Sequence, residues 1–107
     1  MIRLQVIPQL GHDAYKLIRD KVANEAKTWK WSNNAKTRLR RPKDPKAGYI
    51  DVSTAAGILA AEIHSGTRDD WFFAEKLIGR LVAWFPDEIA AINLQILSEP
   101  QKSKSKK

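Results

Sequence analysis

The chain has 107 residues, no cysteine and a formal net charge of +7. A chain of this length forms one domain and can bury a single core without covalent staples. The absence of cysteine excludes disulfides, thiolate nucleophiles and cysteine-ligated zinc. No apolar run approaches the roughly 18 residues that a membrane helix needs, so we expect a cytoplasmic protein with no membrane partner.

Hydrophobic periodicity predicts a strand and then a helix at the start of the chain. Ile2, Leu4 and Val6 alternate with polar residues, which is typical of a half-buried strand. From about Asp13 to Trp29 the apolar residues recur at three- and four-residue steps, which indicates an amphipathic helix. We expect residues 32–34 (Ser-Asn-Asn) to end this helix in a turn, because their side chains compete for backbone hydrogen bonds.

The fold class depends on the middle of the chain, residues 36–64. Thr37–Arg41 fits a short strand with one cationic face, and the prolines after it force a loop. Tyr49–Val52 alternates and is rich in β-forming residues. We favour a hairpin in which a five-residue loop, Ser53–Gly57, leads into a strand over Ile58–His64. The alternative is a capped helix over the same residues.

The last third of the chain predicts a helix, a strand and a tail. Asp69-Asp70 offers an N-cap and negative charge at the start of an aromatic-rich helix that runs to Phe85. Ile92–Leu97 alternates as the first strand does, and a helix that starts at Pro86 is the alternative. Residues 99–107 are rich in lysine and serine and bury nothing, so we expect a disordered basic tail.

Together these elements predict an α+β fold in a single domain, residues 1–98. The expected order is β-α-β-β-(β)-α-β, with an antiparallel-rich sheet of four to five strands and two helices packed on one face. If residues 53–64 and 86–98 are helical instead, the chain is a mostly helical domain with a basic loop.

Positive charge is concentrated in residues 27–46, where eight cations and one anion give 8 − 1 = +7. The four lysines of the tail leave 7 − 7 − 4 = −4 for the rest of the chain. Clustered Lys and Arg bind phosphate backbones by releasing condensed counterions. We therefore predict a noncatalytic nucleic-acid-binding (polyanion-binding) domain that uses a basic strand and loop. Its predicted site residues are Lys36, Arg38, Arg40, Arg41, Lys43 and Lys46, with Trp31 as a candidate stacking group.

The aromatic helix, residues 70–85, supports an alternative function. A helix with large aromatic residues on more than one side is either covered by its own domain or uses the surplus against a partner. The alternative is a protein–protein interaction module or homodimer with no role in nucleic-acid binding. Its predicted interface residues are Trp71, Phe73, Trp84 and Phe85.

No catalytic, cofactor or metal motif accompanies these features. The two histidines, His12 and His64, lack the spacing of a metal or acid–base site. Gly-rich phosphate loops and a GxSxG elbow are also missing from the sequence. The sequence therefore favours a binding protein over an enzyme, and we expect no cofactor.

Overall fold

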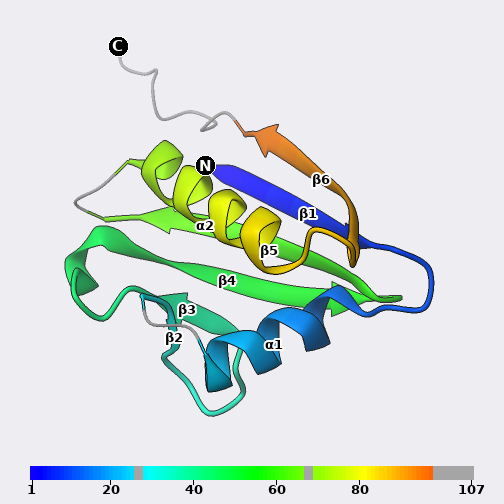
Figure 1. Cartoon of the computed structure of the whole chain (residues 1–107). Helices are drawn as coiled ribbons and strands as arrows, with labels where there is room; N and C mark the ends of the chain where they lie inside the picture. The colour runs from blue at the N-terminus through cyan, green and yellow to red at the C-terminus, as the bar shows by residue number, and fades with distance from the viewer. Residues whose placement is uncertain (26–27, 67–68, 98–107) are drawn as a thin grey trace.

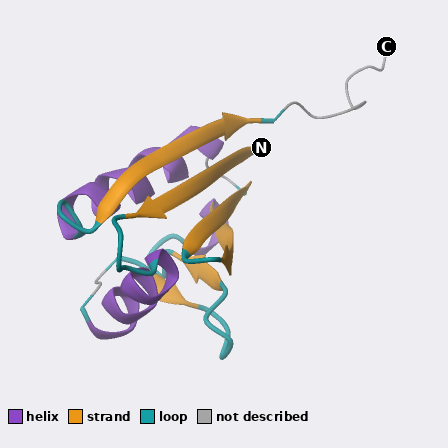
Figure 2. Ribbon diagram, turned by 90° about the vertical axis from the view of Figure 1, so that its right-hand side faces the viewer, coloured by secondary structure: helices purple, strands orange, loops and turns teal. Residues whose placement is uncertain are grey.

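Six strands form one antiparallel sheet in the computed structural model, which describes residues 1–25, 28–66 and 69–97. The elements in chain order are β1 (Ile2–Pro8), α1 (Ala14–Asn24), β2 (Lys30–Trp31), β3 (Arg38–Arg40), the 3-10 helix η1 (Pro45–Ala47), β4 (Gly48–Ala55), β5 (Ile58–Ser65), α2 (Asp70–Trp84) and β6 (Ile89–Ile96). The strands lie in the order β2-β3-β4-β5-β1-β6. Both α-helices pack on the same face of this sheet (Figure 1, Figure 2), and we call the other face the open face.

The predicted α+β class is confirmed, but the sheet has six strands and not four to five. The strand that the sequence did not predict is β2, and helix α1 ends at Asn24, well before Trp29. The side chain of Asn33 explains the difference, since its Oδ1 accepts from the backbone N–H groups of Thr37 at 3.0 Å and Arg38 at 3.1 Å. The polar run after Trp31 thus turns a β2–β3 hairpin.

The β4–β5 connection is shorter than predicted. β4 continues to Ala55, and two residues, Ala56 and Gly57, lead directly into β5. Their φ angles of 54° and 81° are both positive, as in the two-residue turns that match the twist of paired strands. The prediction of a five-residue loop, Ser53–Gly57, is therefore wrong, although the hairpin itself is confirmed.

The two segments with a helical alternative are both strands. Residues 58–65 form β5, and residues 89–96 form β6, so the mostly helical fold is excluded. β6 pairs antiparallel with β1 and begins before the predicted Ile92. The predicted basic tail, 99–107, lies outside the described residues.

One apolar core lies between the helices and the sheet. Ile2, Leu4 and Val6 of β1 are buried there, as their alternation predicts. α1 adds Ala14, Ile18 and Val22, and α2 adds Phe73, Ala74, Leu77 and Leu81. Among the described residues no polar or charged residue is buried, so burial of apolar area is what holds the two helices on the sheet.

An aspartate caps each helix. The carboxylate of Asp13 accepts from the N–H of Lys16 at 3.1 Å, and that of Asp69 accepts from the N–H of Phe72 at 2.9 Å. Each bond satisfies an amide that has no partner within the helix. The predicted start of the second helix at Asp69 is confirmed.

Two aromatic residues near the start of α2, one buried and one exposed, test the packing of this helix on the sheet. Phe73 is fully buried against Trp29, with ring centroids 5.9 Å apart, so Phe73→Ala should lower the free energy of unfolding by about 3–5 kcal/mol. Trp71 is 53% exposed, so Trp71→Ala should cost about 1 kcal/mol or less. Urea denaturation followed by circular dichroism measures both values. Equal losses for the two variants would contradict the burial of Phe73.

Candidate nucleic-acid interface

The centre of the open face carries a row of four charged side chains from four neighbouring strands. The register places Arg3 beside Glu62, Glu62 beside Asp51, and Asp51 beside Arg38. Arg3 donates to Glu62 at 2.9 Å and Arg38 to Asp51 at 2.8 Å. The two acids lie directly opposite each other, which is unfavourable, and an arginine on each outer side compensates them. This row, which we call the neutral row, has no net charge.

The next row of the open face carries an excess of positive charge. Lys30 of β2 lies opposite Arg40 of β3. The register of β3 and β4 brings Arg40 opposite Tyr49, and Tyr49 lies opposite His64 of β5. Within the described residues neither Lys30 nor Arg40 has an ion-pair partner. We call Lys30, Arg38, Arg40 and Tyr49 the basic corner.

Tyr49 holds the two arginines of the basic corner. The Cζ atoms of Arg38 and Arg40 lie 4.0 Å and 5.0 Å from its ring centroid, within the range of cation–π attraction. The imidazole of His64 also stacks on the ring, with centroids 4.8 Å apart and planes inclined by 19°. With these groups against it, Tyr49 is placed to position guanidinium groups and not to stack on a base.

Two glycines allow Tyr49 and His64 to approach each other. A Cβ atom on Gly48, whose φ is 130°, would collide with the carbonyl oxygen of His64, and one on Gly66 would collide with that of Lys46. The N–H of Gly66 also donates to the carbonyl of Ala47 at 2.7 Å. Because only glycine fits such close approaches, these positions hold the end of the β4–β5 hairpin where Tyr49 and His64 lie.

Arg38 is oriented by Asp51 as well as by Tyr49. Its Nε donates to one carboxylate oxygen at 2.8 Å and its Nη2 to the other at 3.3 Å. This hydrogen bond raises the pKa of Arg38 above its ordinary value, so the guanidinium stays charged. The pair is partly exposed and adds little to stability, and its main effect is to fix the side chain's direction.

A polar pocket of about 420 Å³ adjoins the basic corner. The hydroxyl of Ser32 and the amide of Asn33 lie in it at the β2–β3 turn, and both are hydrogen-bonded within the hairpin. The remaining lining residues are Thr37, Arg38, Arg40, Asp51 and Val52. Two guanidinium groups at the edge of a polar hollow suit an anionic group that accepts several N–H bonds.

Two predicted site residues lie away from the open face. The guanidinium of Arg41 lies 5.3 Å from the ring of Trp29 and 5.5 Å from that of Phe72, on the helix side of the sheet. Trp31 packs on α1, where its Nε1 donates to the carbonyl oxygen of Arg19 at 3.2 Å. The structure thus brings Arg38 and Arg40 together and separates Arg41 and Trp31 from them.

The predicted lysines lie in the segments that flank β3, with Lys46 in η1. Lys36 lies in the β2–β3 turn with a φ of 57°, and Lys43 and Lys46 are exposed between β3 and β4. The sequence did not single out Lys30 or Tyr49 as site residues. The alternation of Tyr49–Val52 is the one signal that could have placed Tyr49 on the same face as the cationic strand.

The four aromatic residues predicted for a partner interface differ in exposure. Phe73 and Phe85 are buried in the core, and Trp84 is half-buried against it. Trp71 alone of the four is largely exposed. The helix therefore uses most of its aromatic surface inside its own domain.

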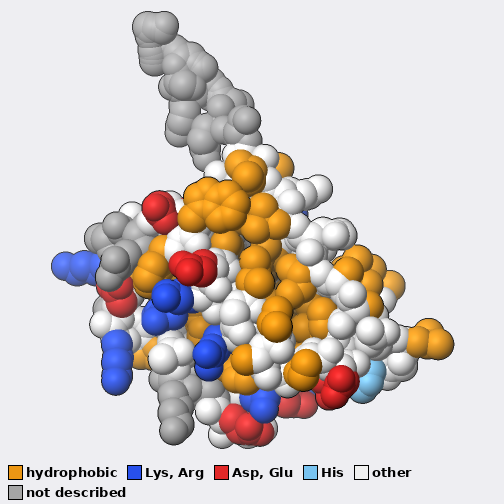
Figure 3. All heavy atoms as spheres, turned by 45° about the horizontal axis from the view of Figure 1, so that its top comes forward, with side chains coloured by type: hydrophobic (Ala, Val, Ile, Leu, Met, Phe, Trp, Pro, Cys, Tyr) orange, Lys and Arg blue, Asp and Glu red, His pale blue; other side chains and the backbone are white. Residues whose placement is uncertain are grey.

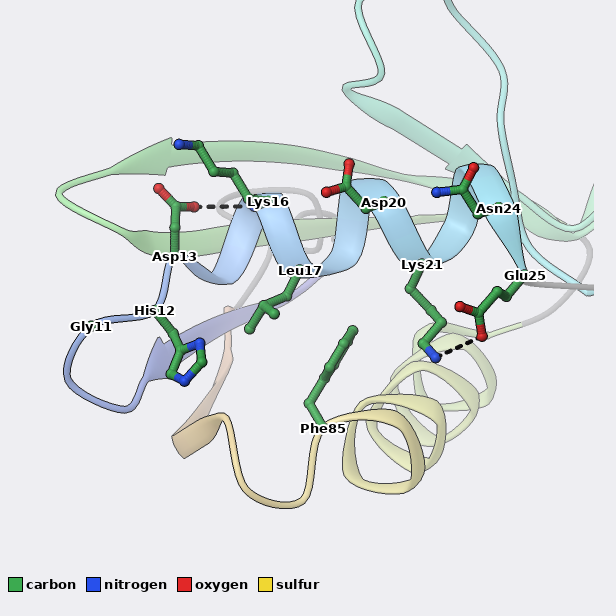
Figure 4. Close-up of a pocket in the computed structure, with 10 residues that line it drawn as sticks. All are labelled: Gly11, His12, Asp13, Lys16, Leu17, Asp20, Lys21, Asn24, Glu25 and Phe85. Carbon is green, nitrogen blue, oxygen red and sulfur yellow. Dashed lines mark hydrogen bonds and ion pairs between the residues drawn. The ribbon is translucent and has the colours of Figure 1, made fainter.

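A second pocket, of about 540 Å³, lies between α1 and the C-terminal end of α2 (Figure 4). Leu17 and Phe85 point toward each other across it, whereas Lys16 and Asp20 point away from Phe85. Lys21 and Glu25 pair there at 2.9 Å. The lining includes two lysines and three acids, a charge of 2 − 3 = −1 with His12 neutral, so this pocket does not suit a polyanion.

Each of the acid–base candidates already has a structural partner, and the Nε2 of His64 lies 3.6 Å from a carboxylate oxygen of Asp51, which Arg38 also holds. Glu62 is paired with Arg3, Asp69 caps α2, and His64 stacks on Tyr49. Across the described residues no group of three or more His, Asp or Glu side chains is placed to hold a metal ion. None of the described helices has the length and apolar character needed to cross a membrane.

Comparison with protein-family models, curated proteins and solved structures finds no match to this chain. Its function must therefore be inferred from the geometry of the site.

The stacking of His64 on Tyr49 gives a direct spectroscopic test of the basic corner. The ring current of Tyr49 should shift the imidazole proton resonances of His64, and Tyr49→Leu should return them toward the values of a free histidine. The exposed His12 is the internal control, because it lies outside this cluster. Proton NMR of the wild type and of Tyr49→Leu measures the shifts. A His64 signal unchanged by Tyr49→Leu would contradict the stacked arrangement.

Proposed function

We propose that the chain is a noncatalytic nucleic-acid-binding domain that contacts the phosphate backbone through the basic corner. The observation that carries this proposal is the placement of Lys30 opposite Arg40 on an open sheet face, beside an Arg38 that Tyr49 and Asp51 hold in place.

A bound anion relieves an unfavourable arrangement at the basic corner. Two cations directly opposite each other on neighbouring strands repel, and neither Lys30 nor Arg40 has a carboxylate partner among the described residues. A phosphate near them would accept from the guanidinium fork of Arg40 and from the ammonium group of Lys30. Because Tyr49 already orients Arg40, little side-chain entropy is lost on binding.

The surrounding lysines favour an extended polyanion over a small anion. Lys36 lies at one end of β3 in the hairpin turn, and Lys43 and Lys46 are exposed beyond its other end. Several cations spread along one strand extend the positive field over a distance that a chain of phosphates matches. Since Trp31 packs on α1 and Tyr49 holds arginines, these contacts support binding to the backbone without base readout.

Removal of Lys30 and Arg40, which have no carboxylate partner in the part of the chain that the structure describes, should weaken nucleic-acid binding. We expect the double variant Lys30→Gln/Arg40→Gln to bind a labelled single-stranded oligonucleotide more weakly than the wild type. The plot of log K against log salt concentration should become shallower by about 1.4, which is about 0.7 for each lost phosphate contact. Fluorescence anisotropy at several salt concentrations measures both quantities.

A charge-matched variant separates the basic corner from overall charge. Lys16→Gln/Arg80→Gln removes two cations from α1 and α2, on the covered side of the sheet, and should bind like the wild type. Equal weakening by the two double variants would show that net charge alone governs binding. No binding by the wild type at low salt would also refute the proposal.

Tyr49 should act on affinity without changing charge. Tyr49→Leu removes the ring that positions Arg38 and Arg40 but leaves every cation in place, so affinity should fall several-fold while the salt slope is unchanged. Tyr49→Phe keeps the ring and should bind like the wild type in the same anisotropy assay. If Tyr49→Leu also binds like the wild type, Tyr49 has no positioning role.

A further inference from the structure

The two edges of the sheet differ in how they are protected. β2, at one edge, has only two residues, of which one is Lys30. Very short edge strands and charged side chains are two of the ways in which proteins prevent edge-to-edge pairing. β6, at the other edge, has eight residues with no charge and no proline (Figure 1). Its edge has neither protection.

The hydrogen bonds at the end of β6 show which backbone groups are left for a partner. The N–H of Leu97 donates to the carbonyl of Met1 at 2.8 Å, and the Met1 amine donates to the carbonyl of Leu97 at 3.2 Å. Bonded and non-bonded pairs alternate along antiparallel strands, so the odd-numbered residues of β6 from 91 to 95 also direct their backbone groups to β1. The backbone groups that point to the free edge belong to Ile92, Leu94 and Ile96.

The side chains of the same three residues lie on the helix side of the sheet, opposite Val6, Leu4 and Ile2. α2 packs on β5 and β1 and leaves the β6 side partly uncovered. Ile96 is 65% exposed there, and Trp71 and Val82 of α2 are 53% and 58% exposed. Hydrophobic side chains gather over α2 and β6 on this face (Figure 3).

We propose that β6 pairs with β6 of a second copy of this chain, antiparallel and about a two-fold axis perpendicular to the sheet. This symmetry puts the helices of both copies on the same side, so each copy covers the apolar surface of the other. The two six-stranded sheets become one continuous sheet. In this pairing Ile92, Leu94 and Ile96 of one copy lie opposite the same set in the other, and such cross-strand apolar pairs stabilise a sheet.

The uncharged edge is the part of the molecule at which a second copy meets the least repulsion. The chain carries +7 overall, so two copies repel, and the repulsion is weakest where they meet at an uncharged element far from the clustered cations. β6 is such an element along its whole length. The basic corner lies near β2, at the opposite edge of the sheet. The strand pairing therefore does not depend on whether the basic corner binds nucleic acid.

Hydrogen exchange of the wild-type protein at high concentration tests the pairing directly. In the dimer the amides of Ile92, Leu94 and Ile96 are bonded across the two-fold axis, so they should be protected as well as those of residues 91, 93 and 95. Light scattering should then give the mass of two chains. The proposal is overturned if light scattering gives the mass of one chain and the amides of residues 92, 94 and 96 exchange fast while those of residues 91, 93 and 95 are protected.

Two variants separate strand pairing from general hydrophobic contact. Ile96→Lys places a charge among the apolar side chains that the pairing would bring together on the helix side of the sheet. It should give a mass of one chain, with fast exchange at Ile92 and Leu94. Leu10→Lys changes a side chain that is fully exposed after β1, and it should keep the mass of two chains. A dimer that survives Ile96→Lys but is lost in Trp71→Lys would assign self-association to α2 and overturn the strand pairing. Circular dichroism confirms folding, and the exchange pattern of the wild type decides the matter if Ile96→Lys does not fold.

Discussion

The burial of one face of each strand under two helices decides where every candidate functional group lies. Leu39 of β3 and Ile50 of β4 must face the core because they are fully buried. Their neighbours along the strands must then face the opposite way, which places Arg38 and Arg40 beside Tyr49 and Asp51. The placement of the basic corner is thus a consequence of core packing.

The open face has one part whose positive and negative charges cancel and another part that carries excess positive charge. In the neutral row, Glu62 and Asp51 repel each other and are each hydrogen-bonded by an arginine from an outer strand. Two residues further along β3, Lys30 and Arg40 face each other with no acid between them in the described chain. Like charges directly opposite each other cost stability, and such departures from local rules are expected at functional sites. The same lysine also protects the β2 edge from pairing, so one residue serves both the fold and the proposed site.

The two edges of the sheet differ in length and charge, and they therefore support different kinds of contact. β2 is short and cationic, and β6 is long and uncharged. If copies pair through β6, the two basic corners lie at the far ends of one continuous sheet, where a single long polyanion could engage both. Binding at two linked sites raises affinity through effective concentration without any new contact.

Much of this fold could be predicted from the sequence, because long alternating segments such as Ile2–Val6 and Ile58–His64 report their buried face directly. β2 could not be predicted, since two residues have no period and its pairing depends on the hairpin that Asn33 closes. The turn at Ala56 was missed because a positive φ is unusual for alanine. The cationic face of Arg38 and Arg40 was predicted correctly from alternation. The role of Tyr49 depends on the register between β3, β4 and β5, which no local pattern specifies.

NMR mapping of the surface that meets nucleic acid tests the central claim most directly. A ¹⁵N-labelled sample is titrated with a short oligonucleotide at low salt, and the shift of each backbone amide is followed. Contact at the basic corner predicts the largest shifts at Lys30, Arg40 and Tyr49, with little change at exposed positions of α1 and α2. Shifts concentrated on the helices, or no shifts at all, would contradict it.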